Sequence, residues 1–168
     1  VVPLFIFMGN VLAGSGIAQG LFSAADRVFG RMRGGLAMAT VLSCGGFSAV
    51  CGSSLATAAT MSKVAMPSMR RFGYSDSLAT GPIAAGGTLG ILIPPSVPLV
   101  IYAILTEQNI AKLFAAATIP GIIAMLGYMI AIAIYVRIRP GHAPDHTVDL
   151  PKMSLQALMG VLPIAIVF

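Results

Sequence analysis

Charged residues are scarce in this chain of 168 residues, where Asp, Glu, Lys and Arg together make up 9%. An ordinary soluble domain carries about 25%. Hydrophobic residues make up 57%, and the mean hydropathy is +0.93. So few charges cannot supply the polar surface that a soluble domain of this size needs. The composition therefore excludes a disordered chain, a nucleic-acid module and a conventional soluble enzyme, although the net charge is +5.

Tryptophan is absent and cysteine is rare. Because the chain has no tryptophan, the interface anchors of a membrane protein must here be tyrosine, lysine and arginine. Cys44 and Cys51 lie two helical turns apart in one apolar run, and we interpret them as small buried hydrophobic residues. Two cysteines provide neither a disulfide framework nor a metal site.

An initiator methionine and a basic leader are also missing, so we expect no signal peptide. The apolar run that closes the chain, 161–168, is shorter than the roughly 20 residues that span a bilayer. We therefore interpret the sequence as a piece of a larger membrane protein.

Long uncharged runs are what the sequence does contain. Residues 1–25, 34–62, 77–106 and 113–136 carry no charge, and each run is long enough to cross a membrane. The sequence thus predicts an all-α integral membrane protein. The segments expected are a partial transmembrane helix over 1–18, an interfacial amphipathic helix over 19–34, a re-entrant helical hairpin over 35–72, a discontinuous transmembrane helix over 76–106, a transmembrane helix over 113–137, a cytoplasmic linker over 138–153 and the start of a truncated helix over 154–168.

The run 34–62 has two interpretations, because small and hydroxyl residues interrupt it near Gly52. Either one helix crosses the membrane, or two half-helices meet at a tip and return to the same side. The hairpin places every Lys and Arg except Lys112 on one side of the membrane, whereas a full crossing divides them almost evenly. Basic residues gather on the cytoplasmic side of membrane proteins, which favours the hairpin.

The run 77–106 is broken by prolines. Pro94, Pro95 and Pro98 remove three backbone donors within five residues. Broken backbone at membrane depth is tolerated only where it is buried in protein or lines a cavity. Together with a re-entrant tip, such a break is typical of secondary transporters. Helix N-termini can face an anion there, while unwound carbonyls and hydroxyls can coordinate a monovalent hard cation such as Na⁺.

The candidate site combines the hairpin tip with the glycines before the proline break. The residues proposed to bind Na⁺ are Gly52, Ser53, Ser54, Thr57, Gly87 and Thr88. Those proposed to line a substrate cavity are Ser54, Gly86, Gly90, Pro94 and Pro95. The alternative is structural: Ser and Thr hydroxyls often bond to their own helix, and the pair Gly86 and Gly90 could form only a packing face.

Catalytic constellations are missing from the apolar runs. They contain no Ser/His/Asp set, no Cys/His set, no paired carboxylates and no P-loop, so we expect no enzyme and no cofactor. His142 and His146 fall in a polar stretch rich in Pro and Asp, which we interpret as a solvated linker.

Three stretches resemble the large membrane subunit of the TRAP (tripartite ATP-independent periplasmic) transporters. They are 52–60 (GSSLATAAT), 66–74 (MPSMRRFGY) and 84–96 (AAGGTLGILIPPS), the last being the most specific. The resemblance extends over about 2–139. It implies the fold of the ion-transporter superfamily, of which this chain would cover the first of two inverted repeats. It also implies a first Na⁺ site between Ser53/Ser54 and Gly87/Thr88.

The resemblance further implies the function and the partners. Such subunits import organic anions, for example C4-dicarboxylates or sialic acids, across the bacterial inner membrane by an elevator mechanism driven by a Na⁺ gradient. They work with a small membrane subunit and a periplasmic substrate-binding protein, and nucleic acid is not a partner. The alternatives are a related carboxylate carrier without a binding protein and a structural membrane subunit that transports nothing.

Overall fold

The computed structural model describes residues 7, 11, 14, 16–30 and 32–139, and every regular element within them is helical. Most of the first predicted span, Arg31, both histidines, the 138–153 linker beyond Arg139 and the 154–168 segment lie outside the described residues. The helices are α2 (Ile17–Phe29), α3 (Gly35–Cys51), α4 (Ser54–Arg71), α5 (Asp76–Leu92), α6 (Val97–Leu105) and α7 (Ile110–Ile138).

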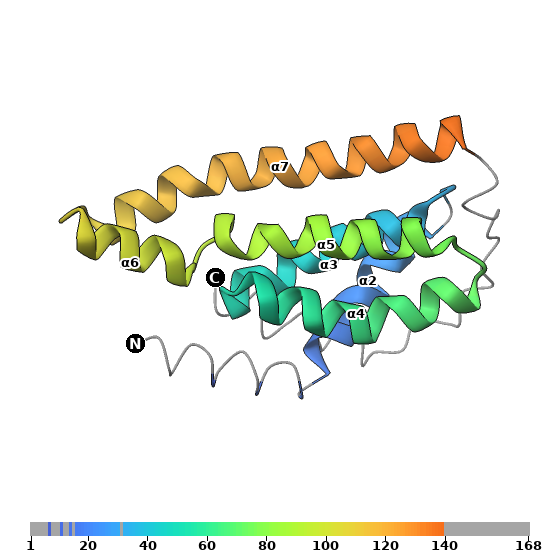
Figure 1. Ribbon diagram of the computed structural model, residues 1–168, viewed down its shortest axis with the longest axis horizontal. Helices are drawn as coiled ribbons and strands as arrows, with labels where there is room; N and C mark the ends of the chain where they lie inside the picture. Colours follow the sequence, from blue (N-terminus) through green and yellow to red (C-terminus); the bar gives the residue numbers. More distant parts are fainter. Residues whose placement is uncertain (1–6, 8–10, 12–13, 15, 31, 140–168) are drawn as a thin grey trace.

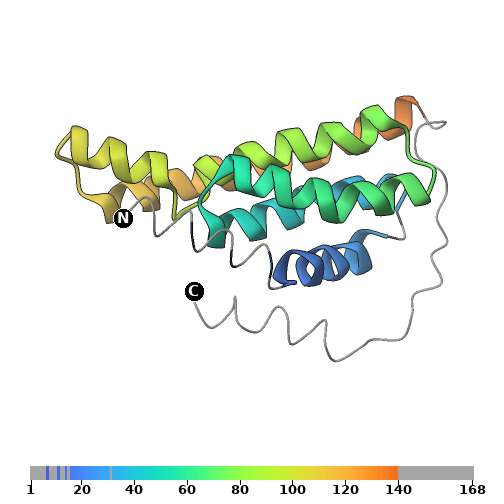
Figure 2. The ribbon, with the colours of Figure 1, turned by 60° about the horizontal axis from the view of Figure 1, so that its bottom comes forward.

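Helix α3 is the centre of the fold and contacts α2, α4, α5 and α7 (Figures 1 and 2). Its sequence is apolar around the whole circumference, as expected for a helix surrounded by others. Phe47 of α3 packs in the core with Met61 and Met69 of α4 and Leu89 of α5, all fully buried. The most deeply buried part of the core therefore lies between α3, α4 and α5, and α2 and α7 add Phe22 and Ile132 to it.

Helix α2 covers one side of α3. It buries Ala18, Phe22 and Ala25 on one face while Val28 is exposed, so it is amphipathic as the sequence predicts. It ends at Phe29 with Gly30 as its C-cap, earlier than the expected boundary at 34. Its position at a membrane interface remains a prediction.

Within the described residues, two helical segments are long and apolar enough to cross a membrane. They are α5 and α6 taken together (Asp76–Leu105) and α7 (Ile110–Ile138). At 29 residues, α7 extends over about 44 Å, which exceeds the roughly 30 Å of the hydrocarbon core. Its exposed face carries isoleucines at 119, 123, 130 and 134, the residue type that lipid tails solvate.

The turn 72–75 connects the end of α4 to the start of α5 and lies beside the start of α3. Tyr74 in this turn is buried beside the first turn of α3, and burial raises its pKa, although a hydrogen bond with the Leu36 backbone opposes that shift. Arg70 bonds Asp76 across the turn, with Nε and Oδ1 3.1 Å apart. These contacts hold the end of α4 against the start of α5.

Candidate binding site at two helix breaks

The hairpin tip is made by two residues between α3 and α4. Gly52 adopts the left-handed conformation (φ 62°, ψ 16°), and its N–H donates to the Ser48 carbonyl at 2.8 Å. A residue with a Cβ is disfavoured there, so glycine ends α3. Ser53 is extended, and its hydroxyl accepts a hydrogen bond from the Ala56 N–H at 3.4 Å, which caps α4. The chain thus reverses within two residues, and α4 returns along α3 (Figure 1).

The two arms of the hairpin are joined through buried hydroxyls just below the tip. Thr57 of α4 donates its hydroxyl to the Ser53 carbonyl at 2.8 Å, and its Oγ1 lies 3.3 Å from Ser48 Oγ of α3. Both side chains are fully buried. In this arrangement Thr57 closes the first turn of α4 and ties it to α3, which is the structural role that back-bonding hydroxyls often have.

The proline break separates α5 from α6. Ile93 leaves the helical conformation (φ −84°, ψ 122°), and its N–H makes the last bond of α5, to the Leu89 carbonyl at 2.8 Å. Pro94 and Pro95, joined by a cis peptide bond, have no N–H with which to continue the helix. Ser96 is fully buried and returns its hydroxyl to the Ile91 carbonyl at 2.9 Å. The chain then starts again as α6 at Val97.

The tip and the break meet. A Cβ added to Gly90 of α5 would lie 2.8 Å from the Ser53 carbonyl carbon and 2.8 Å from the Ser54 nitrogen. A Cβ on Gly87 would lie 2.9 Å from Ala58 Cβ and 3.5 Å from the Ser54 oxygen. On the other side of the break, the Val97 N–H donates to the Gly52 carbonyl at 3.4 Å. The backbone of the tip therefore rests directly on α5 and is bonded to the start of α6.

The predicted site residues separate into two groups. Gly52, Ser53 and Ser54 come together with Gly87 and Gly90 at the tip. Elsewhere, Gly86 faces α3, where an added Cβ would lie 2.8 Å from the Cys44 sulfur. Thr88 points toward α7 and not toward the tip: its hydroxyl donates to the Ala85 carbonyl at 2.6 Å and lies 3.1 Å from the Tyr128 hydroxyl.

Four helix ends converge at this point. The C-termini of α3 and α5 present carbonyl groups, which carry partial negative charge, and the N-termini of α4 and α6 present partial positive charge. The described residues contain no cluster of three or more His, Cys, Asp or Glu side chains placed to hold a metal ion. The ligands on offer at the tip are neutral oxygens and backbone N–H groups.

Two residues that shape the site, Ser96 and Ile93, are not among the predicted site residues. Ser96 could have been found, because a small hydroxyl residue just before a helix that has proline in its first turn is typical of an N-terminal boundary. The position in which Ile93 packs, against α3 and α7, could not have been found from the sequence. A Cβ on Gly121 of α7 would lie 3.1 Å from Ile93 Cγ1, and one on Gly45 of α3 would lie 3.6 Å from its Cδ1. These glycines are far apart in the sequence and share no pattern.

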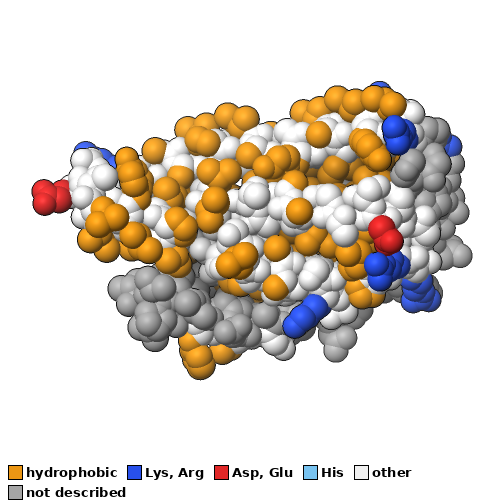
Figure 3. All heavy atoms as spheres, in the orientation of Figure 1, with side chains coloured by type: hydrophobic (Ala, Val, Ile, Leu, Met, Phe, Trp, Pro, Cys, Tyr) orange, Lys and Arg blue, Asp and Glu red, His pale blue; other side chains and the backbone are white. Residues whose placement is uncertain are grey.

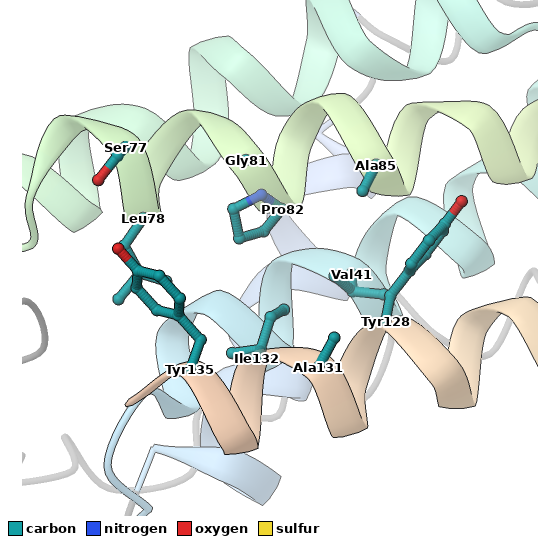
Figure 4. Close-up of a pocket in the computed structure, with 10 residues that line it drawn as sticks. All are labelled: Val41, Ser77, Leu78, Gly81, Pro82, Ala85, Tyr128, Ala131, Ile132 and Tyr135. Carbon is teal, nitrogen blue, oxygen red and sulfur yellow. The ribbon is translucent and has the colours of Figure 1, made fainter. Parts of the chain in front are cut away.

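A hollow lies between α5 and α7, on a face of α5 that the tip does not touch. Figure 4 shows Tyr128 and Tyr135 of α7 at its two ends, with Pro82 of α5 above Ile132. Its volume is about 350 Å³, and its lining is apolar apart from Ser77 and the two phenol hydroxyls. Unlike the tip, it is not lined by helix ends.

Comparison with known proteins identifies the family. Residues 1–168 match the family described as tripartite ATP-independent periplasmic transporter, DctM component. The C4-dicarboxylate TRAP transporter large permease protein DctM of Pseudomonas aeruginosa is 38% identical, over 99% of this chain and 39% of the relative. The sialic acid TRAP transporter large permease protein SiaM of Vibrio cholerae is 36% identical, over 91% of this chain and 34% of the relative. This chain thus spans about two fifths or less of these relatives, and it belongs to the DctM component family of the TRAP transporters.

Proposed function

We propose that this chain forms the first repeat of a Na⁺-coupled permease that imports an organic anion across the bacterial inner membrane. The observation that carries the proposal is the convergence of four helix ends where the hairpin tip rests on α5. Discontinuous helices that meet near the middle of a membrane protein are where secondary transporters bind their substrates and coupling ions.

The cation part of the site is assigned to the carbonyl side of this junction. Na⁺ is bound by neutral oxygens, and the tip supplies the Ser53 and Ser54 hydroxyls together with the carbonyl ends of α3 and α5. Gly90 lets the backbone of Ser53 and Ser54 lie against α5, because a side chain there would collide with it, and Gly87 leaves room for the Ala58 side chain of α4. Thr57 stabilises this arrangement by donating its hydroxyl to the Ser53 carbonyl.

The anion part is assigned to the two N-termini. The start of α4 at Ser54 and the start of α6 after Pro94 and Pro95 direct their N–H groups and dipoles toward the same region. A carboxylate is the substrate group that such a site favours, and the relatives named above carry C4-dicarboxylate and sialic acid in their names. We infer a carboxylate of this kind for this chain, with the second half of the cavity supplied by a second inverted repeat.

The remaining parts of the transporter follow from the same proposal. The fold is that of the ion-transporter superfamily, the hairpin is re-entrant, and the tip gates access as the transport unit moves by an elevator mechanism. A small membrane subunit and a periplasmic substrate-binding protein complete the system.

Uptake by the full-length subunit and its partners in proteoliposomes tests this proposal. We expect accumulation of labelled succinate or sialic acid only when an inward Na⁺ gradient is imposed, and not when K⁺ replaces Na⁺. Ser54→Ala should raise the Na⁺ concentration for half-maximal uptake by about tenfold, which corresponds to the loss of one ligand to a charged group. Ser62→Ala is the matched control, since Ser62 lies in the same helix with its hydroxyl on the Ala59 carbonyl. Uptake that is indifferent to Na⁺ would overturn the coupling, and equal effects of both variants would overturn the assignment of Ser54.

A further inference from the structure

A groove distinct from the hollow between α5 and α7 lies where α7 terminates. This end of α7 is far from the hairpin tip (Figure 1). It separates the connection between α2 and α3 from the last turns of α7, and its volume is about 400 Å³. Its lining combines four apolar residues with two arginines: Met32, Met38, Ala133, Val136, Arg33 and Arg137. No residue of the proposed transport site lines it.

The backbone of the α2–α3 connection approaches the Val136 side chain of α7 closely at this groove. Gly34 has a left-handed conformation (φ 76°), and a Cβ added to it would lie 2.7 Å from Val136 Cγ2. The Gly35 N–H then donates to the Met32 carbonyl at 2.8 Å and holds the turn that carries Arg33. As a result, Arg33 stands at the same groove as Arg137 of α7, although the two are far apart in the sequence.

The chemistry of the lining indicates what could occupy the groove. Two arginines line this one groove, and an anion within it is attracted by both guanidinium groups. Arginine is also the side chain whose fork of N–H donors matches a phosphate. The floor is apolar, since the other lining residues are Met32, Met38, Ala133 and Val136, of which Met32 is 54% exposed. An anionic head with methylene groups attached fits both parts, whereas a free inorganic anion leaves the floor unused.

The position of the groove along α7 agrees with such an amphiphile. Arg137 lies in the last turn of α7, and Ile130, Ile134 and Ile138 around it are exposed. Lys and Arg at the end of a spanning helix lie at the level of the lipid headgroups. A basic hollow between helices at this level is suited to an acidic lipid.

We propose that this groove binds an anionic phospholipid, with its phosphate between Arg33 and Arg137 and the beginning of an acyl chain over Met38, Ala133 and Val136. The proposal is independent of the transported substrate and of the coupling ion. It assigns to the α2–α3 connection a function beyond linking two helices: it fixes the end of α7 at the membrane surface through a shared lipid.

Native mass spectrometry of the full-length subunit tests this site, with dioleoylphosphatidylglycerol as the probe and dioleoylphosphatidylcholine as the zwitterionic comparison. We expect Arg137→Gln to weaken binding of the anionic lipid about tenfold, as for the loss of one charge-assisted hydrogen bond. Arg71→Gln is the matched control. Arg71 also lies in the last turn of its helix, so both variants lose the same favourable interaction with a helix C-terminus, but Arg71 does not line this groove.

A second variant separates the lipid from a soluble anion. Ala133→Trp fills the apolar part of the groove and keeps both arginines, so it should weaken phosphatidylglycerol binding while the total charge is unchanged. Inorganic phosphate added at millimolar concentration should not displace the lipid. Equal losses in the Arg137 and Arg71 variants, equal binding of the two lipids, or complete displacement by phosphate would each overturn the proposal. Monodisperse elution of every variant shows that the fold is retained.

Discussion

Gly90 is the residue on which the meeting of tip and break depends most directly. The backbone of Ser53 and Ser54 occupies the space that a side chain at position 90 would need. Backbone atoms cannot rotate away as the end of a flexible side chain can. The tip must therefore move as a whole if anything larger than hydrogen is placed there.

We accordingly predict that Gly90→Ala strongly reduces Na⁺-driven uptake by the full-length subunit. Overpacking of this kind costs roughly 1–3 kcal/mol, and the displaced tip loses its alignment with the break. Gly81→Ala is the matched control, because Gly81 is exposed on the same helix and an added Cβ meets nothing within 4 Å. Initial rates of labelled substrate uptake at saturating Na⁺ provide the measurement. If the two alanine variants transport equally well, the contact between α5 and the tip is not required for function.

At the scale of elements, the breaks could be predicted from the sequence, whereas the rotation of each helix could not. Pro94 and Pro95 cannot continue a helix, and the glycine and serine residues from Gly52 onward are typical of a helix end followed by a cap. The structure interrupts the chain at both places. These are local effects of backbone chemistry, which one sequence is enough to indicate.

The direction of Thr88 illustrates what was missed. Gly87 and Gly90 are three residues apart and share one face of α5, but Thr88 is turned by about 100° from Gly87 and by about 200° from Gly90. Closeness in the sequence therefore does not place two side chains on the same face of α5. Which face meets the tip is decided by packing against α3, α4 and α7, and that packing depends on contacts such as Gly86 with Cys44, which no periodicity specifies.

Thr88 is thus expected to matter for the contact between α5 and α7. Its hydroxyl and that of Tyr128 are 3.1 Å apart on an otherwise apolar contact. We predict that Tyr128→Phe lowers the stability of the detergent-solubilised subunit by about 1 kcal/mol, the usual net contribution of one hydrogen bond in such a setting. The melting temperature measured by intrinsic fluorescence or light scattering gives the comparison.

Tyr102→Phe is the control for this change, because Tyr102 is 55% exposed on α6. It removes the same hydroxyl without touching the contact between α5 and α7. A melting temperature lowered equally by both variants would show that the loss of a phenol hydroxyl, and not the bond to Thr88, causes the effect.

At the scale of the whole molecule, most basic side chains lie toward one end of the long axis. Basic side chains gather where α4 and α7 end, and the connection between α6 and α7, which carries Glu107, forms the opposite end (Figures 1 and 3). The start of α3 lies beside the end of α7, since Gly34 touches Val136. Both ends of the α3–α4 hairpin are therefore at the basic end, while its tip lies at the other end of α5, beside Gly90.

This arrangement gives a prediction about topology that separates a re-entrant hairpin from a helix that crosses. In a full-length subunit whose Cys44 and Cys51 are replaced by alanine, single cysteines are introduced as Arg33→Cys, Arg71→Cys and Glu107→Cys. In membrane vesicles of known orientation, an impermeant maleimide should label positions 33 and 71 from the same, cytoplasmic side and position 107 only from the other. Basic residues are retained on the cytoplasmic side during insertion, which sets this orientation. Labelling of 33 and 71 from opposite sides would mean that the chain crosses between them. The tip would then open to the far surface and could not serve as a gate at membrane depth.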